Sequence, residues 1–216
     1  MTEQIRRVMV WSGWLRFSHA ALALATLVLM ATGWLLASSP TLAAAASDIH
    51  FLAASILIAA LMLRLVMGFF GKGAERFGHL LPRSSELAAI RASLLFYLTL
   101  GKAPLPNWFA HNPLWKPVYL ILFVLLALSA LTGWVMPEIQ VVGRLYLPRV
   151  HGWLSNAIWV VTLAHLFSVV LQDIRGRAAD VSGMLSGYRF FVFERDGAMK
   201  PGVKQVSVKL DDLGRP

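Results

Sequence analysis

Four long apolar runs dominate the sequence, and shorter stretches richer in polar residues, glycine and proline separate them. A membrane helix needs about 20 mostly apolar residues, because it rises about 1.5 Å per residue through a hydrocarbon core about 30 Å thick. Each run is long enough to meet this requirement. The pattern therefore predicts four membrane helices, at about 15–37, 49–70, 114–136 and 151–171.

Two further segments have a different pattern. Residues 84–100 include Glu86 and Arg91 and carry apolar residues at helical spacing, which predicts an amphipathic helix lying on the inner membrane surface. From Gly183 onward polar and apolar residues alternate, as expected for a small cytoplasmic tail. We therefore expect an all-α integral membrane four-helix bundle over residues 1–182, with a short interfacial helix, and a tail over 183–216.

The composition supports a membrane protein and narrows its chemistry. Hydrophobic residues make up 57% of the chain and charged residues 14%, whereas globular proteins have about 25% charged residues. These values exclude a soluble domain and a disordered chain. The absence of cysteine excludes disulfides, iron–sulfur clusters, thiolate metal sites and covalently attached haem.

The net charge is +9, and the basic residues that cause it are concentrated in some of the segments that connect or flank the apolar runs. Most of the 20 Lys and Arg residues lie in the N-terminus, the long middle connection and the tail, while the connection between the third and fourth runs has only Arg144 and Arg149. By the positive-inside rule both termini are cytoplasmic. The basic residues lie in blocks between apolar runs, so we expect membrane lipid and no nucleic acid as a partner.

A short motif recurs with an offset of about 100 residues. Thr32-Gly33-Trp34 ends the first run and Thr132-Gly133-Trp134 ends the third, while His50 and His151 open the runs that follow. One interpretation is a duplicated helical hairpin. The other is that glycine and tryptophan are common at the ends of membrane helices, where they serve close packing and the lipid interface. Both interpretations remain open at this point.

Histidines are the main candidates for chemistry. His79 and His111 lie in the middle connection, where histidines are most often solvated or capping residues. The other four lie within or at the edges of the apolar runs, where ionisable residues are functional candidates. They are His19, His50, His151 and His165.

Helical geometry divides these four histidines into two sites. His151 and His165 are 14 residues apart, which is about 21 Å along a helix and close to four full turns. They share a face but cannot share a metal ion, which excludes a single zinc site or a binuclear centre. By depth, His19 pairs with His165 in the inner leaflet. By the same argument, His50 pairs with His151 in the outer leaflet.

Two imidazoles on different helices at one depth suit axial ligation of a haem iron. Two pairs predict two haems, which must be non-covalent b-type because cysteine is absent. Arg16 and Arg64 lie on the inner side and are candidates for neutralising haem propionates, with snorkelling to the headgroups as the alternative. The tryptophans near the ends of the runs are expected to be interface anchors. They are Trp14, Trp34, Trp134 and Trp153.

These residues resemble the prokaryotic cytochrome b561 superfamily. The likeness rests on Arg16-Phe-Ser-His19, His50 with Arg64-Leu-Val-Met-Gly68, His111-Asn-Pro113, and His151 with His165. Within the superfamily the chain looks most like the cytochrome b subunits of nickel–iron hydrogenases and related formate dehydrogenases. The resemblance implies the same two ligand pairs. Gly152 departs from members that have an acidic residue there, which leaves the subfamily open.

The leading hypothesis is a membrane-anchor, electron-transfer subunit in the bacterial inner membrane, and its classification as an enzyme is left open. It would connect a periplasmic oxidoreductase subunit, such as a hydrogenase, or a c-type cytochrome with the quinone pool, in a hetero-oligomer. The alternative is a stand-alone quinone oxidoreductase of the cytochrome b561 type. A proton or metal transporter is disfavoured, because the runs lack the acidic residues and broken helices that transport requires.

Overall fold

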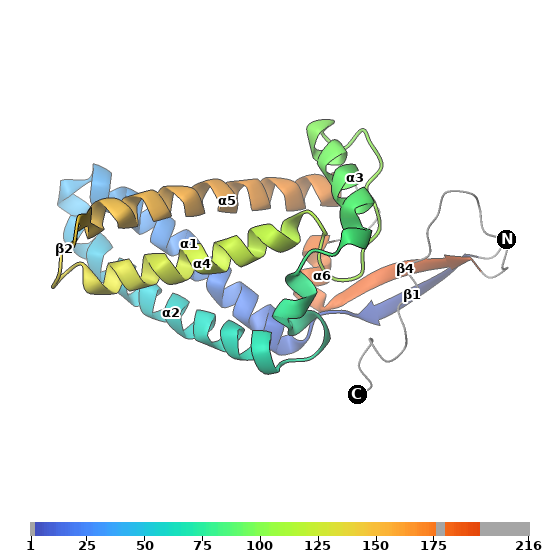
Figure 1. Ribbon diagram of the computed structural model, residues 1–216, viewed down its shortest axis with the longest axis horizontal. Helices are drawn as coiled ribbons and strands as arrows, with labels where there is room; N and C mark the ends of the chain where they lie inside the picture. The colour runs from blue at the N-terminus through green and yellow to red at the C-terminus, as the bar shows by residue number, and fades with distance from the viewer. Residues whose placement is uncertain (1–2, 176–179, 195–216) are drawn as a thin grey trace. The chain divides into compact units, whose positions relative to one another are not determined.

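Four long helices form most of the structure, a computed structural model that describes residues 3–175 and 180–194 (Figure 1). They are α1 (Gly13–Ser38), α2 (Ala43–Phe70), α4 (Trp115–Val135) and α5 (Leu147–Arg175). In the described part of the chain these four are long and apolar enough to cross a membrane. The predicted all-α fold with four membrane helices is confirmed.

The largest differences from the predicted starts are at α2 and α5, which both begin about a turn or more earlier. α2 begins at Ala43 rather than at residue 49, because Ser47 and Asp48 interrupt the apolar run but the alanines before them favour helix. α5 begins at Leu147 with Pro148 in its first turn, where a missing backbone N–H breaks no helical hydrogen bond. His50 therefore lies about two turns inside α2.

The chain divides into two compact units. The helical unit comprises Phe17–Met67 and Pro117–Leu166 and holds the central parts of the four long helices. Between α1 and α2 it includes η1 (Pro40–Leu42), and between α4 and α5 it includes a hairpin of β2 (Val141–Val142) and β3 (Leu145–Tyr146). Gly143 turns this hairpin with a φ of 61°, which glycine adopts without strain.

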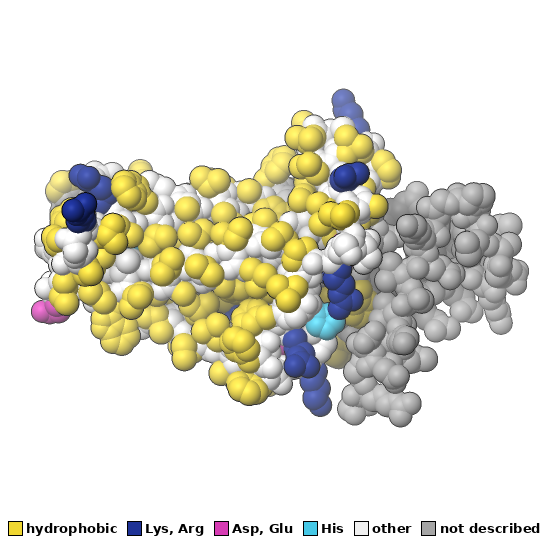
Figure 2. All heavy atoms as spheres, in the orientation of Figure 1, with side chains coloured by type: hydrophobic (Ala, Val, Ile, Leu, Met, Phe, Trp, Pro, Cys, Tyr) yellow, Lys and Arg dark blue, Asp and Glu magenta, His cyan; other side chains and the backbone are white. Residues whose placement is uncertain are grey.

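The core of the helical unit is apolar and is built by all four helices. It consists of Leu22, Ala25, Leu57, Ala60, Leu61, Leu126 and Ile158. The outward faces are apolar as well, as the exposed side chains of Leu24, Met62, Val124 and Val160 illustrate. Figure 2 shows hydrophobic side chains spread over the face that the long helices present to the viewer. An apolar exterior of this extent is what lipid contact requires.

The terminal unit comprises Met1–Arg16, Gly68–Lys116 and Phe167–Pro216. Its described elements outside the long helices are β1 (Glu3–Met9), η2 (Gly73–Glu75), η3 (Phe77–Leu80), η4 (Ser84–Glu86), α3 (Leu87–Leu98), α6 (Asp180–Ser186) and β4 (Tyr188–Glu194). α3 confirms a helix within the segment predicted at 84–100. β1 and β4 pair antiparallel, with Glu3 opposite Glu194 and Met9 opposite Tyr188. The boundary at 182/183 stays a prediction, and residues 195–216 of the predicted tail lie outside the described residues.

Arg189 anchors β4 within the terminal unit. Its buried guanidinium lies 5.3 Å from the ring centroid of Trp108, and its Nη1 donates to the carbonyl oxygens of Trp108 and Phe109 at 2.8 and 2.9 Å. Stacking and charge-assisted hydrogen bonds together compensate for burying the cation. β4 is therefore attached to the connection that precedes α4.

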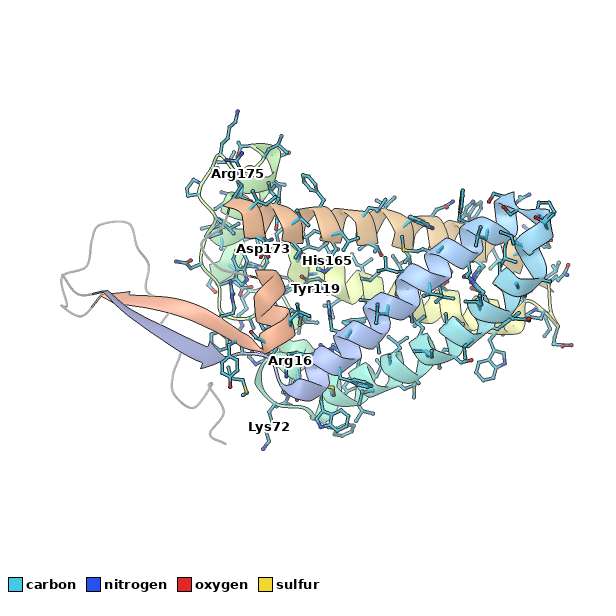
Figure 3. All side chains as sticks on the ribbon, turned by 180° about the vertical axis from the view of Figure 1, so that it is seen from behind. Arg16, Lys72, Tyr119, His165, Asp173 and Arg175 are labelled. Carbon is cyan, nitrogen blue, oxygen red and sulfur yellow. The ribbon has the colours of Figure 1, made fainter. Side chains whose placement is uncertain are left out.

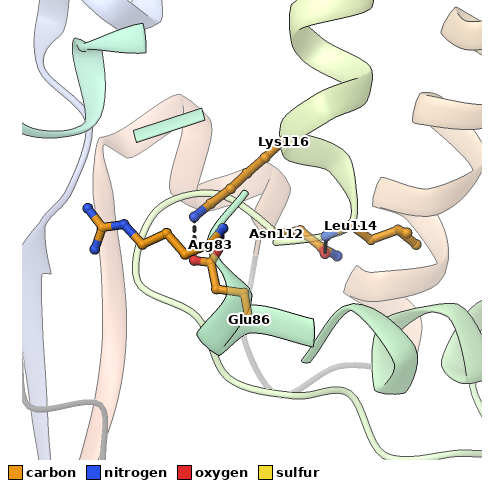
Figure 4. A network of polar contacts seen from close by, with 5 residues as sticks. All are labelled: Arg83, Glu86, Asn112, Leu114 and Lys116. Carbon is orange, nitrogen blue, oxygen red and sulfur yellow. Dashed lines mark hydrogen bonds and ion pairs between the residues drawn. The ribbon is translucent and has the colours of Figure 1, made fainter. Parts of the chain in front are cut away.

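A second polar network lies at the start of α4 (Figure 4). Lys116 Nζ forms an ion pair with Oε1 of Glu86 at 2.5 Å, and the other carboxylate oxygen of Glu86 accepts from the backbone N–H of Arg83 at 3.1 Å. Asn112 Oδ1 accepts from the backbone N–H of Leu114 at 3.0 Å, just before the first turn of the helix. These contacts connect the beginning of α4 to η4.

Candidate functional site

The four membrane histidines lie in the helical unit and form two pairs. The rings of His19 on α1 and His165 on α5 have centroids 6.4 Å apart and planes inclined by 68°. The rings of His50 on α2 and His151 on α5 also have centroids 6.4 Å apart, with planes inclined by 71°. The structure thus brings together the two pairs that the depth argument proposed. Their role as iron ligands stays a prediction.

The spacing of the rings fits two imidazoles binding one metal ion from opposite sides. A metal–imidazole nitrogen bond is about 2.0 Å long and the ring nitrogen lies roughly 1.2 Å from the ring centroid, so such a pair has centroids about 6.4 Å apart. Both observed separations are 6.4 Å. In the described part of the chain no group of three or more His, Asp or Glu side chains is close enough to hold a metal ion. Each pair offers two imidazoles, a set of donors that fits a haem iron.

Threonine hydroxyls orient both histidines of the His50–His151 pair. Thr32 Oγ1 lies 2.8 Å from Nδ1 of His50, and Thr132 Oγ1 lies 3.1 Å from Nδ1 of His151. Each hydroxyl donates its own proton to a carbonyl of the preceding turn, that of Val28 or Leu128. The hydroxyl oxygen can then accept from Nδ1–H, which leaves Nε2 as the nitrogen with a lone pair for a metal.

The glycine after Thr132 lets His151 approach, whereas at Gly33 a Cβ would make only ordinary contact with His50. A Cβ on Gly33 would lie 3.6 Å from Cε1 of His50, and one on Gly133 would lie 3.1 Å from Cε1 of His151. Each Thr-Gly pair therefore contacts the histidine of the next helix, so the recurring motif has a specific role at this site. Trp34 and Trp134 are exposed, as expected for interface anchors.

The same offset leads to Tyr119 near the His19–His165 pair, a residue that the sequence analysis did not name, and to Arg64, which it did. One hundred residues after His19 is Tyr119, whose ring lies edge-on to His165 with centroids 5.8 Å apart (Figure 3). Arg64 corresponds to His165, since Arg64 lies 14 residues after His50 and His165 lies 14 residues after His151. The repeat therefore extends beyond Thr-Gly-Trp and His to these positions.

The two candidate arginines have different surroundings. Arg64 is 4% exposed, and its guanidinium lies 5.3 Å from the ring centroid of Phe123. This burial favours a role inside the helical unit over snorkelling. Arg16 belongs to the terminal unit, where its Nη1 donates to the carbonyl oxygen of Leu185 at 2.5 Å. His79 and His111 also lie in the terminal unit, away from either pair in sequence.

Comparison with known proteins decides the family. The profile of the prokaryotic cytochrome b561 family matches residues 10–187. This chain belongs to the prokaryotic cytochrome b561 family. The resemblance inferred from its residues is confirmed, and membership of a b-type cytochrome family implies haem b in a multi-pass membrane protein.

Several relatives of this cytochrome b561 protein have descriptive names. It is 27% identical to the probable Ni/Fe-hydrogenase B-type cytochrome subunit of Azotobacter vinelandii, over 89% of this chain and 94% of the relative. It is 26% identical to the subunit so named in Bradyrhizobium diazoefficiens, over 85% and 86% of the two chains. It is 22% identical to the probable Ni/Fe-hydrogenase 1 B-type cytochrome subunit of Escherichia coli K12, over 82% and 88%. No solved structure matches significantly.

Proposed function

We propose that this cytochrome is a membrane-anchor, di-haem subunit that transfers electrons between a periplasmic redox partner and the quinone pool. The observation that carries the proposal is the presence of two histidine pairs, each with ring centroids 6.4 Å apart, on helices able to cross a membrane. A hydrogenase is the first candidate partner, because relatives across nearly the whole chain are named as hydrogenase cytochrome subunits.

Each pair of histidines would hold one haem b. His19 and His165 form one ligand set, and His50 and His151 form the other. The bound irons supply a reversible one-electron change. α5 contributes to both sets at positions 14 residues apart, so the sets are separated by about 21 Å along the helix and lie in opposite leaflets. Electrons would therefore cross most of the membrane between the two sites.

The arginines would provide positive charge on the His19–His165 side. Arg64 is buried at a position equivalent to that of His165, and an anionic haem propionate nearby would compensate its charge. Arg16, three residues before His19, has the same proposed role. In this way the chain balances charge at a depth where an isolated cation is unfavourable.

The distribution of basic residues sets the proposed orientation. With both termini cytoplasmic in the bacterial inner membrane, the His50–His151 pair lies toward the periplasm and the His19–His165 pair toward the cytoplasm. A periplasmic oxidoreductase subunit or c-type cytochrome would dock near the His50–His151 pair. Quinone would react near the His19–His165 pair. Docking of the protein partner would make the functional unit a hetero-oligomer.

The test combines haem counting with partner identification. We expect the purified protein to contain two haems b per chain by the pyridine haemochrome assay. His165→Ala and His50→Ala should each lose one haem and retain the other, because the ligand sets do not overlap. Loss of neither haem, or of both in each variant with the helices still folded by circular dichroism, would contradict the pairing. A hydrogenase subunit should co-purify, whereas an isolated chain that reduces quinone from a soluble donor would favour the stand-alone alternative.

A further inference from the structure

A cavity of about 430 Å³ lies where α2 ends, outside the histidine sites. Its polar lining consists of Arg76, His79 and Arg83, and its aromatic lining of Phe69 and Phe77. All of these residues belong to the terminal unit. Figure 2 shows basic side chains next to a histidine on the surface. The cavity therefore combines cationic and apolar surfaces.

The positive charge in this cavity is not neutralised by the acidic residues nearby. Within the described residues neither Arg76 nor Arg83 forms an ion pair. Glu75 accepts from the Ser12 hydroxyl and from the backbone N–H of Lys72. Glu86 is engaged by Lys116 and by the backbone N–H of Arg83 (Figure 4). Two guanidinium groups thus line an opening that contains no carboxylate among its lining residues.

The apolar side of the cavity continues onto the membrane helix. Phe69 and Phe70 are 63% and 84% exposed at the end of α2, and Phe69 lies edge-on to Phe77 with ring centroids 5.4 Å apart. Gly68 makes this packing possible, because a Cβ there would lie 2.1 Å from a carbon of the Phe77 ring. A ligand in the cavity would meet cations on one side and a lipid-facing aromatic surface on the other.

We propose that this cavity binds the headgroup of an anionic phospholipid. Arg76 and Arg83 donate to the phosphodiester oxygens, with His79 beside them, and the acyl chains lie along Phe69 and Phe70. Arginine suits this role because its planar donors match phosphate oxygens, and basic pockets at the cytoplasmic ends of membrane helices commonly bind anionic lipids. The site is separate from electron transfer. It relies on the proposed orientation only for the leaflet that supplies the lipid.

The test measures lipid retention by the full chain. The purified protein is delipidated in detergent, mixed with phosphatidylglycerol or phosphatidylcholine, and analysed by native mass spectrometry. We expect preferential binding of phosphatidylglycerol, and an affinity roughly ten- to thirtyfold weaker in the double variant Arg76→Gln, Arg83→Gln. The matched control is Arg91→Gln, Lys102→Gln, which removes two basic residues of the same connection outside the cavity and should bind like the wild type.

The results that would contradict lipid binding can be told apart from those that would contradict the proposed electron transfer. Equal binding by the wild type and the cavity variant would overturn the proposal, and so would an equal loss in the control variant. Displacement of the lipid by millimolar inorganic phosphate would show that the site takes free phosphate instead. Haem content is recorded for every variant. A failure of lipid binding with two haems retained would leave the proposed electron-transfer function standing, whereas a missing haem would count against that function alone.

Discussion

The Thr32 hydroxyl oxygen lies 2.8 Å from Nδ1 of His50. Thr132 on α4 makes the same kind of contact with Nδ1 of His151 on α5. A hydrogen bond from Nδ1–H makes an imidazole a more electron-donating ligand, which favours the oxidised metal. The potential of a site can thus depend on residues that do not bind the metal.

The threonine contacts lead to a prediction about potential. Thr32→Val keeps the side-chain shape and removes the hydroxyl, so the midpoint potential of the His50–His151 site should rise by roughly 40 mV, which corresponds to about 1 kcal/mol for one hydrogen bond. Redox titration followed by visible absorbance measures this shift. Thr32→Ser retains the hydroxyl and is expected to titrate like the wild type. An equal shift in both variants would contradict the hydrogen-bond explanation.

Glycine substitutions test how closely helices approach the same pair. Gly133→Ala places a methyl group 3.1 Å from His151 Cε1, whereas Gly33→Ala places one 3.6 Å from His50 Cε1, which is ordinary contact. We expect Gly133→Ala to lower haem retention at this site and Gly33→Ala to retain it. Gly152→Ala, beside His151 with nothing within 4 Å of the new Cβ, is the control and should keep two haems.

Tyr119 is predicted to fix the orientation of the His165 ring. Its ring packs edge-on to His165 at an interplanar angle of 83°. Tyr119→Phe keeps the ring and should leave the electron paramagnetic resonance spectrum of the oxidised His19–His165 site unchanged. Tyr119→Leu removes the ring and should shift the g values of that site alone. A shift of the same size in both variants would assign the effect to the hydroxyl.

Arg64 is predicted to raise the potential of the His19–His165 site, because a buried positive charge stabilises the added electron. Arg64→Leu should lower the midpoint potential by roughly 50 to 100 mV, the effect of a unit charge about 10 Å away at an effective dielectric constant of about 20. Arg64→Lys retains the charge and should preserve most of the potential. The other site, about 21 Å along the helices, should change much less. An unchanged potential in Arg64→Leu would contradict this role.

Arg189 is predicted to stabilise the terminal unit without affecting either histidine pair. Arg189→Met leaves the carbonyl oxygens of Trp108 and Phe109 without their donor, at a cost of about 2 to 4 kcal/mol. Thermal unfolding followed by circular dichroism should begin several degrees lower, while the haem spectrum at low temperature stays the same. The exposed Arg91→Met is the control, with an expected change close to zero. A wild-type melting curve for Arg189→Met would show that the contact is dispensable.

The helices and the histidine pairs could be anticipated from the sequence because their signals are local or periodic. Apolar runs of sufficient length predict spans, and the 14-residue spacing on one helix separates two sites whatever the packing. The start of α2 cannot be placed from the sequence. The charged Asp48 indicates the edge of an apolar run, whereas the helix itself begins at Ala43. Pairing of β1 with β4 joins opposite ends of the chain, and no local pattern indicates such a partner.

The surroundings of the histidines were harder to anticipate than the histidines themselves. A tyrosine in an apolar helix, such as Tyr119, looks like any packing or interface residue until a neighbour is known. Thr32 and Gly33 have the composition of a helix end, and only the contact of Thr32 with His50 shows that they also lie at a histidine. The burial of Arg64 likewise depends on Phe123, which lies on another helix.

α4 carries none of the four histidines, yet it contacts one at each level, through Thr132 at His151 and Tyr119 at His165. On the proposed ligand assignment, α4 would influence both metal sites without supplying a ligand to either. Under the proposed function, substitutions along α4 would change the potential of either site while the four proposed ligands stay in place. α4 is therefore the helix in which a change of sequence would alter these potentials without replacing any of the four histidines.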